Sequence, residues 1–316
     1  MINFFKSLAQ DPRRRNITIG VLVLVVASFF LKVPEPHVSL AAEPLLQNGP
    51  DWFTNALFST ILVDIVIIIV AIIGRASLKE IPSGFGNFVE FSIESLYNLT
   101  ESVAGKNARR FFPIAATIFI FVIFSNYVDV LPGVGSIGVW HEPEGEHALV
   151  VEQPMASLDG GLVLSSDAAA PAAEEGERLF VSFLRPPSAD LNVTLALAII
   201  VMVMVQYYGA SALGLKYFKK FFNFGGKGFM GAIFAVVGIL ELISEIAKVI
   251  SFSFRLFGNI FAGEVLLAVM AFLFAFLLPV PFFGLEFFVG FIQALVFMML
   301  AVAFFSTAMI GHDDHH

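Results

Sequence analysis

The chain has 316 residues, of which 58% are hydrophobic and only 14% are charged. A soluble protein carries about a quarter charged residues, so this composition excludes an ordinary water-soluble globule and indicates a membrane protein. The absence of cysteine excludes disulfides, thiolate nucleophiles and Cys-type zinc sites. The net charge of −8 comes largely from one acidic loop.

Apolar runs predict the membrane helices, because a helix crosses a bilayer core with about 20 apolar residues. The runs lie at residues 17–31, 53–73, 111–130, 193–215 and 229–310. Pro279 and Pro281 divide the last run into a hairpin, and its first arm is long enough to require a strong tilt. We therefore predict an all-α integral membrane protein with about six membrane helices, the last two forming a long tilted hairpin.

Most of the 18 Lys and Arg residues fall in connections on one side of the membrane if the N-terminus is inside. Because positive residues mark the cytoplasmic side, this bias predicts a multi-pass protein with both termini cytoplasmic if the first helix is retained. The first run follows three arginines and precedes a Ser-Leu-Ala-Ala sequence, which is also typical of a cleavable signal peptide. We favour retention of this segment.

Two further segments are too polar to span a membrane. Residues 81–105 alternate apolar and acidic side chains at helical spacing, which predicts an amphipathic helix on the inner surface. Residues 134–190 form an acidic outer loop that is expected to be solvated and partly flexible.

The expected organisation has four parts. They are an N-terminal helix or signal-like segment (1–34), a part with the first core span, the surface helix and the second core span (35–133), the acidic loop (134–190), and the channel helices with the tilted C-terminal hairpin (191–316).

Polar residues recur at helical spacing inside the long apolar run. At about 100° per residue, a set of them lies within an arc of about 120°, and we call this set the polar stripe. It consists of Glu241, Ser244, Glu245, Lys248, Ser251, Arg255 and Asn259. Such residues are costly in a membrane and usually functional. An internal ion pair is the alternative for Glu245 and Lys248, and Glu264 falls on a different face.

Arg255 is the most informative member of the polar stripe. An arginine cannot be deprotonated in a protein, so it cannot relay a proton. No acid lies three or four residues away from it, and its fixed charge would attract a carboxylate of a partner and repel leaking protons. Polar neighbours can hold water that conducts protons. This arrangement predicts two offset half-channels that meet at Arg255.

Other polar residues begin or follow the predicted spans. Glu286 and Gln293 are seven residues apart and share one face of the last helix. Glu286 is predicted to exchange protons, with a capped interfacial acid as the alternative. Asp190 and Asn192 begin the fourth span, where Asp190 is also a candidate N-cap. We interpret Asp129 as interfacial.

No chemical active site is predicted. The chain contains no GxxxxGK[ST] phosphate-binding loop, and its six histidines lie outside the apolar runs. His312, His315 and His316 are interpreted as a solvated tail. We therefore expect no cofactor, no metal and no nucleic-acid partner. Whether the chain counts as an enzyme depends on the complex to which it belongs.

Four segments resemble subunit a of F-type ATP synthases, the ATP synthase A chain family. The sequence SFRLFGNIFAGE at 253–264 is similar to the family signature. The match continues with PSADLNVT at 187–194, NYVDVLPG at 126–133 and QALVF at 293–297, in the order that the family shows. The long outer loop and the N-terminal segment depart from compact members of the family.

The resemblance implies a proton-translocating stator in the lipid bilayer that faces a rotating ring of c subunits and contacts peripheral-stalk b subunits. It makes Arg255 the essential charge facing the ring carboxylates. Nucleotide chemistry would take place on a separate soluble head. The resemblance assigns the remaining polar residues to the proton path: Glu241 and Ser251 on the inner side, Asn259 and Gln293 beside Arg255, and Glu264, Glu286, Asn192 and Asp190 on the outer side.

Two other classes of membrane protein predict different sequence features. A self-contained transporter would show internal repeats, and none is evident in the sequence. A structural subunit of a respiratory complex would not need Arg255, Asn259 and Glu264 in this arrangement. The sequence leaves open proton or sodium as the ion, the size of the ring, the direction of operation and the purpose of residues 134–190.

Overall fold

The computed structural model describes residues 39–46, 49–77, 84–131, 134–135, 137–141, 179–214, 217–218, 221, 229–273 and 279–310, with isolated positions 16, 18–20 and 23. Five helical segments of this part are long and apolar enough to cross a membrane. The chain is therefore an all-α, multi-pass membrane protein. Most of the predicted first span, most of the acidic loop and the histidine tail lie outside the described residues.

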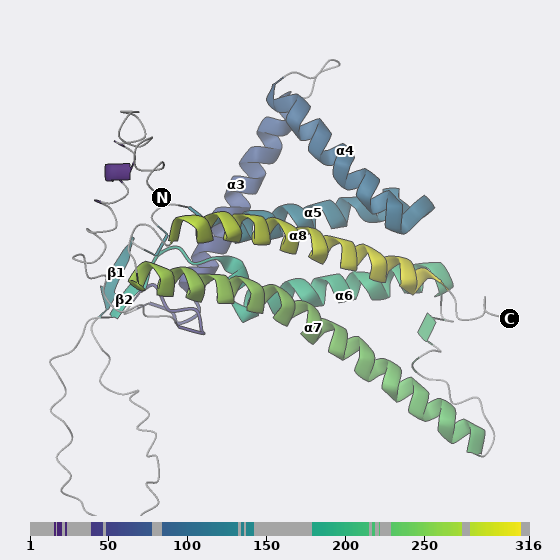
Figure 1. The fold of residues 1–316 in the computed structure, drawn as a ribbon. Coiled ribbons are helices and arrows are strands. Elements are labelled where there is room, and N and C mark those ends of the chain that lie inside the picture. Colours follow the sequence, from purple (N-terminus) through teal and green to yellow (C-terminus); the bar gives the residue numbers. More distant parts are fainter. Residues whose placement is uncertain are drawn as a thin grey trace, which may run out of the picture.

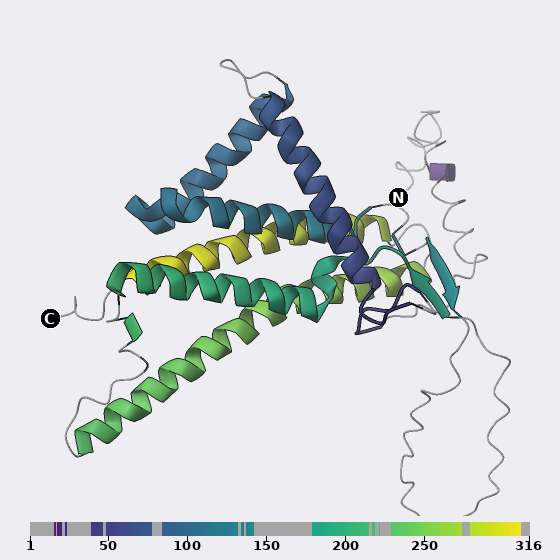
Figure 2. The ribbon, with the colours of Figure 1, turned by 180° about the vertical axis from the view of Figure 1, so that it is seen from behind.

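The first two described helices form an angle that projects from the bundle. Helix α3 (Asn55–Ser77) leads away from the other membrane helices, and α4 (Phe85–Ala104) returns toward them (Figures 1 and 2). The short helix η1 (Gly105–Asn107) then connects α4 to α5 (Ala108–Tyr127). Gly105 has φ 53°, a left-handed conformation that glycine adopts without steric cost. It ends α4 and redirects the chain into the bundle.

Helix α6 (Leu191–Leu213) follows the 3-10 helix η2 (Pro187–Ala189). The side chain of Asp190 accepts a hydrogen bond of 2.9 Å from the backbone N–H of Asn192. This bond satisfies one of the unpaired N–H groups at the start of the helix. Asp190 is therefore the N-cap of α6, as one of the two interpretations of this residue predicts.

The last two helices form the predicted hairpin. Helix α7 (Phe229–Leu273) has 45 residues, and α8 (Pro279–Met309) begins at the first of the two prolines. At 1.5 Å per residue α7 is about 68 Å long, more than twice the thickness of a bilayer core of about 30 Å. It cannot lie upright within the hydrocarbon. In Figure 1 it crosses α6 obliquely and diverges from α8, and its N-terminal part extends away from the bundle.

The core lies where α5, α6, α7 and α8 meet. The rings of Phe111, Tyr208 and Phe305 join α5, α6 and α8, with centroids 4.8 to 5.6 Å apart. Phe252 of α7 packs edge-on against Phe297 of α8 at 4.6 Å. Close packing of this kind holds membrane helices together, because lipid is as apolar as the side chains. The bundle therefore fixes the two arms of the hairpin against α5 and α6.

A two-stranded antiparallel ribbon closes the base of the acidic loop. Strand β1 (Gly138–His141) pairs with β2 (Leu179–Ser182), and the rings of Trp140 and Phe180 lie 5.1 Å apart. Valine and aromatic residues favour strands, so these short segments pair although the acidic composition predicts a largely flexible loop. We use the term ribbon end for the end of the bundle that carries this pair (Figure 1).

Candidate functional site

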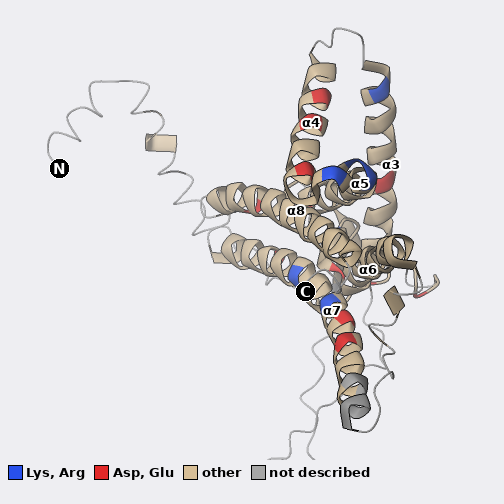
Figure 3. Ribbon diagram, turned by 90° about the vertical axis from the view of Figure 1, so that its right-hand side faces the viewer, with Lys and Arg blue, Asp and Glu red and all other residues tan. Residues whose placement is uncertain are grey.

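Arg255 lies on a face of α7 that no other described helix covers. Its side chain is exposed, and it makes no hydrogen bond or ion pair with any described residue. Figure 3 shows the charges of α7 gathered in one stretch of an otherwise uncharged helix. A fixed charge within a membrane span is costly unless it is paired, so Arg255 is a candidate contact for an anionic group outside the described residues.

The same face of α7 is built from small residues. Ser251 lies four residues before Arg255. Gly258 lies three residues after it and Ala262 seven residues after it, and all three small residues are exposed. A Cβ atom added to Gly258 would meet nothing within 4 Å. Small residues at this spacing allow another helix to approach the backbone closely. The face around Arg255 is therefore suited to a closely packed partner helix.

Two amides link the hairpin beside Arg255. The side-chain nitrogen of Asn259 donates a 3.1 Å hydrogen bond to the side-chain oxygen of Gln293. Gln293 is 7% exposed, and its own nitrogen is buried without a hydrogen-bond partner among the described residues. The polar stripe thus continues from α7 into the α7–α8 interface. The face of α8 that was predicted to carry both Glu286 and Gln293 lies at this interface.

Polar groups of the other half of α7 face α6. Glu245 is buried and accepts a 3.0 Å hydrogen bond from Lys248, which is the predicted i,i+3 pair. Gln206 of α6 donates to the same carboxylate at 3.2 Å and accepts from the hydroxyl of Tyr217 at 2.9 Å. Glu241 lies one turn further from Arg255 and is half-buried. These residues form a polar connection at the end opposite the ribbon.

Glu264 and Glu286 lie close together near the ribbon end. Glu286 is 5% exposed, and its carboxylate lies directly against the Cα of Gly263. One oxygen of Glu286 is buried without a hydrogen-bond partner in the described part of the chain. The residue lies inside α8 and not at its start, so it is not an N-cap. Glu264 lies 3.6 Å from the guanidinium of Arg185. Glu264 is therefore on a different face from Arg255, as the helical spacing predicts.

Asp129 is a third acid of this group, and the interpretation of it as merely interfacial is incomplete. It follows the end of α5, and its Oδ2 atom is buried without a hydrogen-bond partner among the described residues. Burial, followed by the negative charges of Glu264 and Glu286, raises the pKa of Asp129 from 3.8 to about 7. We call Asp129, Glu264 and Glu286 the outer acid cluster.

The raised pKa of Asp129 leads to a measurable titration. Its carboxyl is expected to be protonated at pH 6 and ionised at pH 8, because a pKa of about 7 lies between them. The measurement is infrared spectroscopy of the purified complex, in which the band of a protonated carboxyl should titrate near pH 7. The Asp129→Asn variant should lack this band, which assigns it to Asp129. The exposed Asp51→Asn variant should keep this band. A midpoint near 4 would contradict the burial argument.

Comparison with known proteins settles the family. Residues 56–306 match the family described as "ATP synthase A chain". The chain belongs to this family. It is similar to the ATP synthase subunit a of Gloeobacter violaceus, with 31% identity over 89% of this chain and 92% of that protein. The subunit a proteins of Geobacter sulfurreducens and Moorella thermoacetica are 28% and 27% identical, over 89% and 85% of this chain and 94% and 96% of theirs.

Membership of the ATP synthase A chain family confirms the resemblance found in the sequence. It also confirms the corresponding function, that of a proton-translocating stator subunit in the membrane sector of an F-type ATP synthase. The matched residues include all four motifs that carry the resemblance. They also include every predicted site residue.

The structure brings most predicted site residues into three groups along the hairpin. Arg255, Ser251, Asn259 and Gln293 lie in the middle, Glu241 lies toward the end opposite the ribbon, and Glu264 and Glu286 lie near the ribbon. Asn192 is exposed on the first turn of α6, where Asp190 acts as the cap. The sequence did not single out the contacts of Arg185 and Gln206, because both depend on pairing with other helices.

Proposed function

We propose that this ATP synthase A chain conducts protons through two half-channels, and that Arg255 separates them and faces the carboxylates of a c ring. The observation that carries the proposal is the exposed Arg255 within a membrane span, without a partner among the described residues. Its guanidinium attracts an ionised carboxylate and cannot itself pass on a proton. A ring carboxylate supplies the missing anion.

The outer half-channel runs through the outer acid cluster. Carboxyls that are buried close together share protons readily, because their negative charges repel one another when all are ionised. A proton would enter between Asn192 and Asp190 at the ribbon end and pass the cluster. It would then reach the amide pair of Asn259 and Gln293 beside the ring.

The inner half-channel follows the polar stripe toward the opposite end. Ser251 lies one turn before Arg255, and Glu241 lies further along the same helix. Glu245 and Gln206 offer additional oxygen and nitrogen atoms from the α6–α7 interface. A proton released from the ring would leave along these groups.

The two half-channels couple ion flow to rotation. A proton from the outer side neutralises a ring carboxylate, which can then move into lipid. Rotation brings the next carboxylate to Arg255, which favours its ionised form and releases its proton inward. The driving force is about 2.3 kcal/mol per charge for each 100 mV of membrane potential. Sodium would follow the same route if the ring carboxylate site bound it.

The remaining partners and the location follow from the same arrangement. We place the protein in a bacterial plasma membrane with both termini cytoplasmic, because Lys and Arg concentrate on that side. The ribbon end then faces outward. Helix α4 lies along the inner surface, where Phe88 and Phe91 are exposed toward lipid and peripheral-stalk b subunits.

A cross-linking experiment tests the ring contact. The chain has no cysteine, so Ser251→Cys introduces a single thiol on the Arg255 face of α7. A benzophenone maleimide attached to this thiol in the native complex should form a photo-adduct with a small two-helix subunit. The matched control is Ile246→Cys, which is also exposed on α7 but points to another side.

The two outcomes separate the candidate functions. An adduct with a small ring subunit from position 251 but not from 246 supports the stator arrangement. Adducts with lipid alone, or a purified complex that lacks any small subunit, would favour a self-contained transporter or a respiratory-complex subunit instead.

A further inference from the structure

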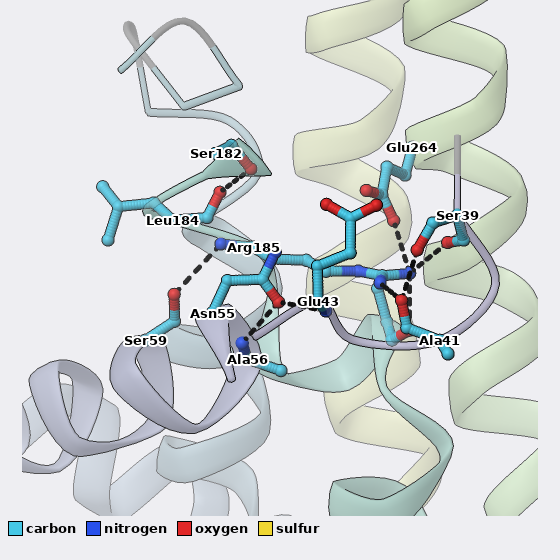
Figure 4. Close-up of polar contacts among 11 residues, drawn as sticks. Ser39, Ala41, Glu43, Asn55, Ala56, Ser59, Ser182, Leu184, Arg185 and Glu264 are labelled. Atoms are coloured by element: carbon cyan, nitrogen blue, oxygen red, sulfur yellow. Dashed lines mark hydrogen bonds and ion pairs between the residues drawn. The ribbon is translucent and has the colours of Figure 1, made fainter. Parts of the chain in front are cut away.

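Arg185 is deeply buried at the ribbon end. It lies three residues after the end of β2 and is only 4% exposed. Its guanidinium donates hydrogen bonds to the backbone oxygens of Ser39, Ala41 and Ala189, at 2.8, 2.6 and 3.4 Å (Figure 4). The same group lies 3.6 Å from the carboxylate of Glu264. One arginine thus contacts an N-terminal segment, the start of α6 and the membrane helix α7.

The N-terminal segment that Arg185 contacts is itself fixed in place. We call residues 39–46 the strap. Glu43 of the strap exchanges hydrogen bonds with Asn55 at the start of α3, at 3.0 and 3.2 Å. Leu45 is buried and donates a backbone hydrogen bond to Phe53. Arg185 completes this attachment, and its own backbone N–H donates to the hydroxyl of Ser59 on α3 at 3.0 Å.

The charges around Glu264 come from every element packed against it. Arg185 is the positive group that the structure places there, and Glu43 of the strap and Asp129 after α5 are the negative groups that interact with Glu264. Asp129 also interacts with Glu286 of α8. A buried arginine stays charged and is costly without a counter-charge. Glu264 supplies that counter-charge, whereas Asp129 has no such cation among its electrostatic contacts.

The division of roles within the outer acid cluster follows from this arrangement. Glu264 has a fixed positive neighbour in Arg185, and this charge offsets part of the cost of burying its carboxylate. The other acids carry the exchangeable proton, because three negative charges cannot be held close together without cost. The position of the Glu264 carboxylate within the cluster is therefore tied to Arg185, its ion-pair partner at 3.6 Å.

We propose that Arg185 is a positioning residue of the outer half-channel, which fixes the Glu264 side chain in place and fastens the strap over the outer acid cluster. This inference rests on the proposed proton path. The two hydrogen bonds to the backbone oxygens of Ser39 and Ala41 hold the guanidinium in place. The ion pair then holds the Glu264 carboxylate against it.

The test uses Arg185→Gln, Arg185→Lys, Glu264→Gln and the double variant Arg185→Gln/Glu264→Gln in the assembled complex. ATP-driven proton pumping in inverted vesicles is measured and divided by the amount of assembled chain. Arg185→Gln should reduce pumping about tenfold or more, as misplacement of a reacting group does. Arg185→Lys should restore a large part of it, because the positive charge remains. The exposed Arg109→Gln should pump like the wild type.

The double variant separates charge pairing from a purely structural contact. Because both partners of the ion pair are gone, its loss should be smaller than the two single losses combined. Normal pumping by Arg185→Gln would overturn the inference and leave the proposed function intact, since that function depends on Arg255. The inference would also be overturned if Arg185→Gln and Arg185→Lys lost pumping equally and the losses of the double variant were additive. Failure of both single variants to assemble would likewise assign Arg185 a folding role only.

Discussion

Replacing Arg255 with alanine is expected to abolish ATP-driven proton pumping in inverted vesicles. The substitution removes the fixed positive charge of the open face of α7, and that face has no other cation within one helical turn of position 255. A ring carboxylate would then have no group to favour its ionised form, and no charge would separate the two half-channels. The measurement is the quenching of a pH-sensitive dye after ATP addition, with ATP hydrolysis followed in parallel.

The control for this variant is Arg109→Ala, which removes an exposed arginine at the start of α5. It should pump at the wild-type rate. Vesicles stripped of the soluble head provide a second measurement, in which the Arg255→Ala membrane sector should leak protons passively. Pumping near the wild-type rate in Arg255→Ala would show that another group is the central charge, and the half-channel mechanism would be wrong.

Gly263→Ala is expected to reduce pumping by about tenfold or more, although it adds only one methyl group. The new Cβ would overlap the carboxylate of Glu286, and the flexible end of that side chain is the part that can move away. Glu286 would then leave its place beside Glu264. Displacement of a reacting group by about 1 Å is enough for losses of this size.

Gly284→Ala is the matched control on α8, because a Cβ at this position would meet nothing within 4 Å. It should leave pumping unchanged. Thermal unfolding of both purified variants separates a local effect from general destabilisation. If Gly263→Ala pumps normally while its complex is intact, the contact between α7 and the Glu286 carboxylate has no part in proton transfer.

Much of the helical architecture could be predicted from the sequence. The length of each apolar run is enough to identify α3, α5, α6 and the hairpin, and Pro279 marks the start of α8. Helical spacing also predicts that Arg255 and Asn259 share a side of α7 and that Glu264 does not. These predictions succeed because each uses only the residues of a single helix and no contact between helices.

The contacts between helices could not be predicted in this way. Asp129 is a single acid near a span end, and only the packing of α5 against α8 shows that it joins Glu264 and Glu286. In the sequence Arg185 is only one of a few cations in an outer loop. Its neighbouring residues do not indicate a partner 79 positions away at Glu264. In a membrane protein, core-facing and lipid-facing surfaces are both apolar, so periodicity does not show which faces meet.

The residues of the outer acid cluster and of its arginine come from distant parts of the chain. Asp129 follows α5, Arg185 precedes α6, and Glu264 and Glu286 lie on the two arms of the hairpin. A nascent chain that has inserted only its first helices therefore lacks most of the outer proton path. Proton conduction along the proposed outer path is therefore expected only after the last helix has packed, so partly inserted chains are expected not to dissipate the proton gradient.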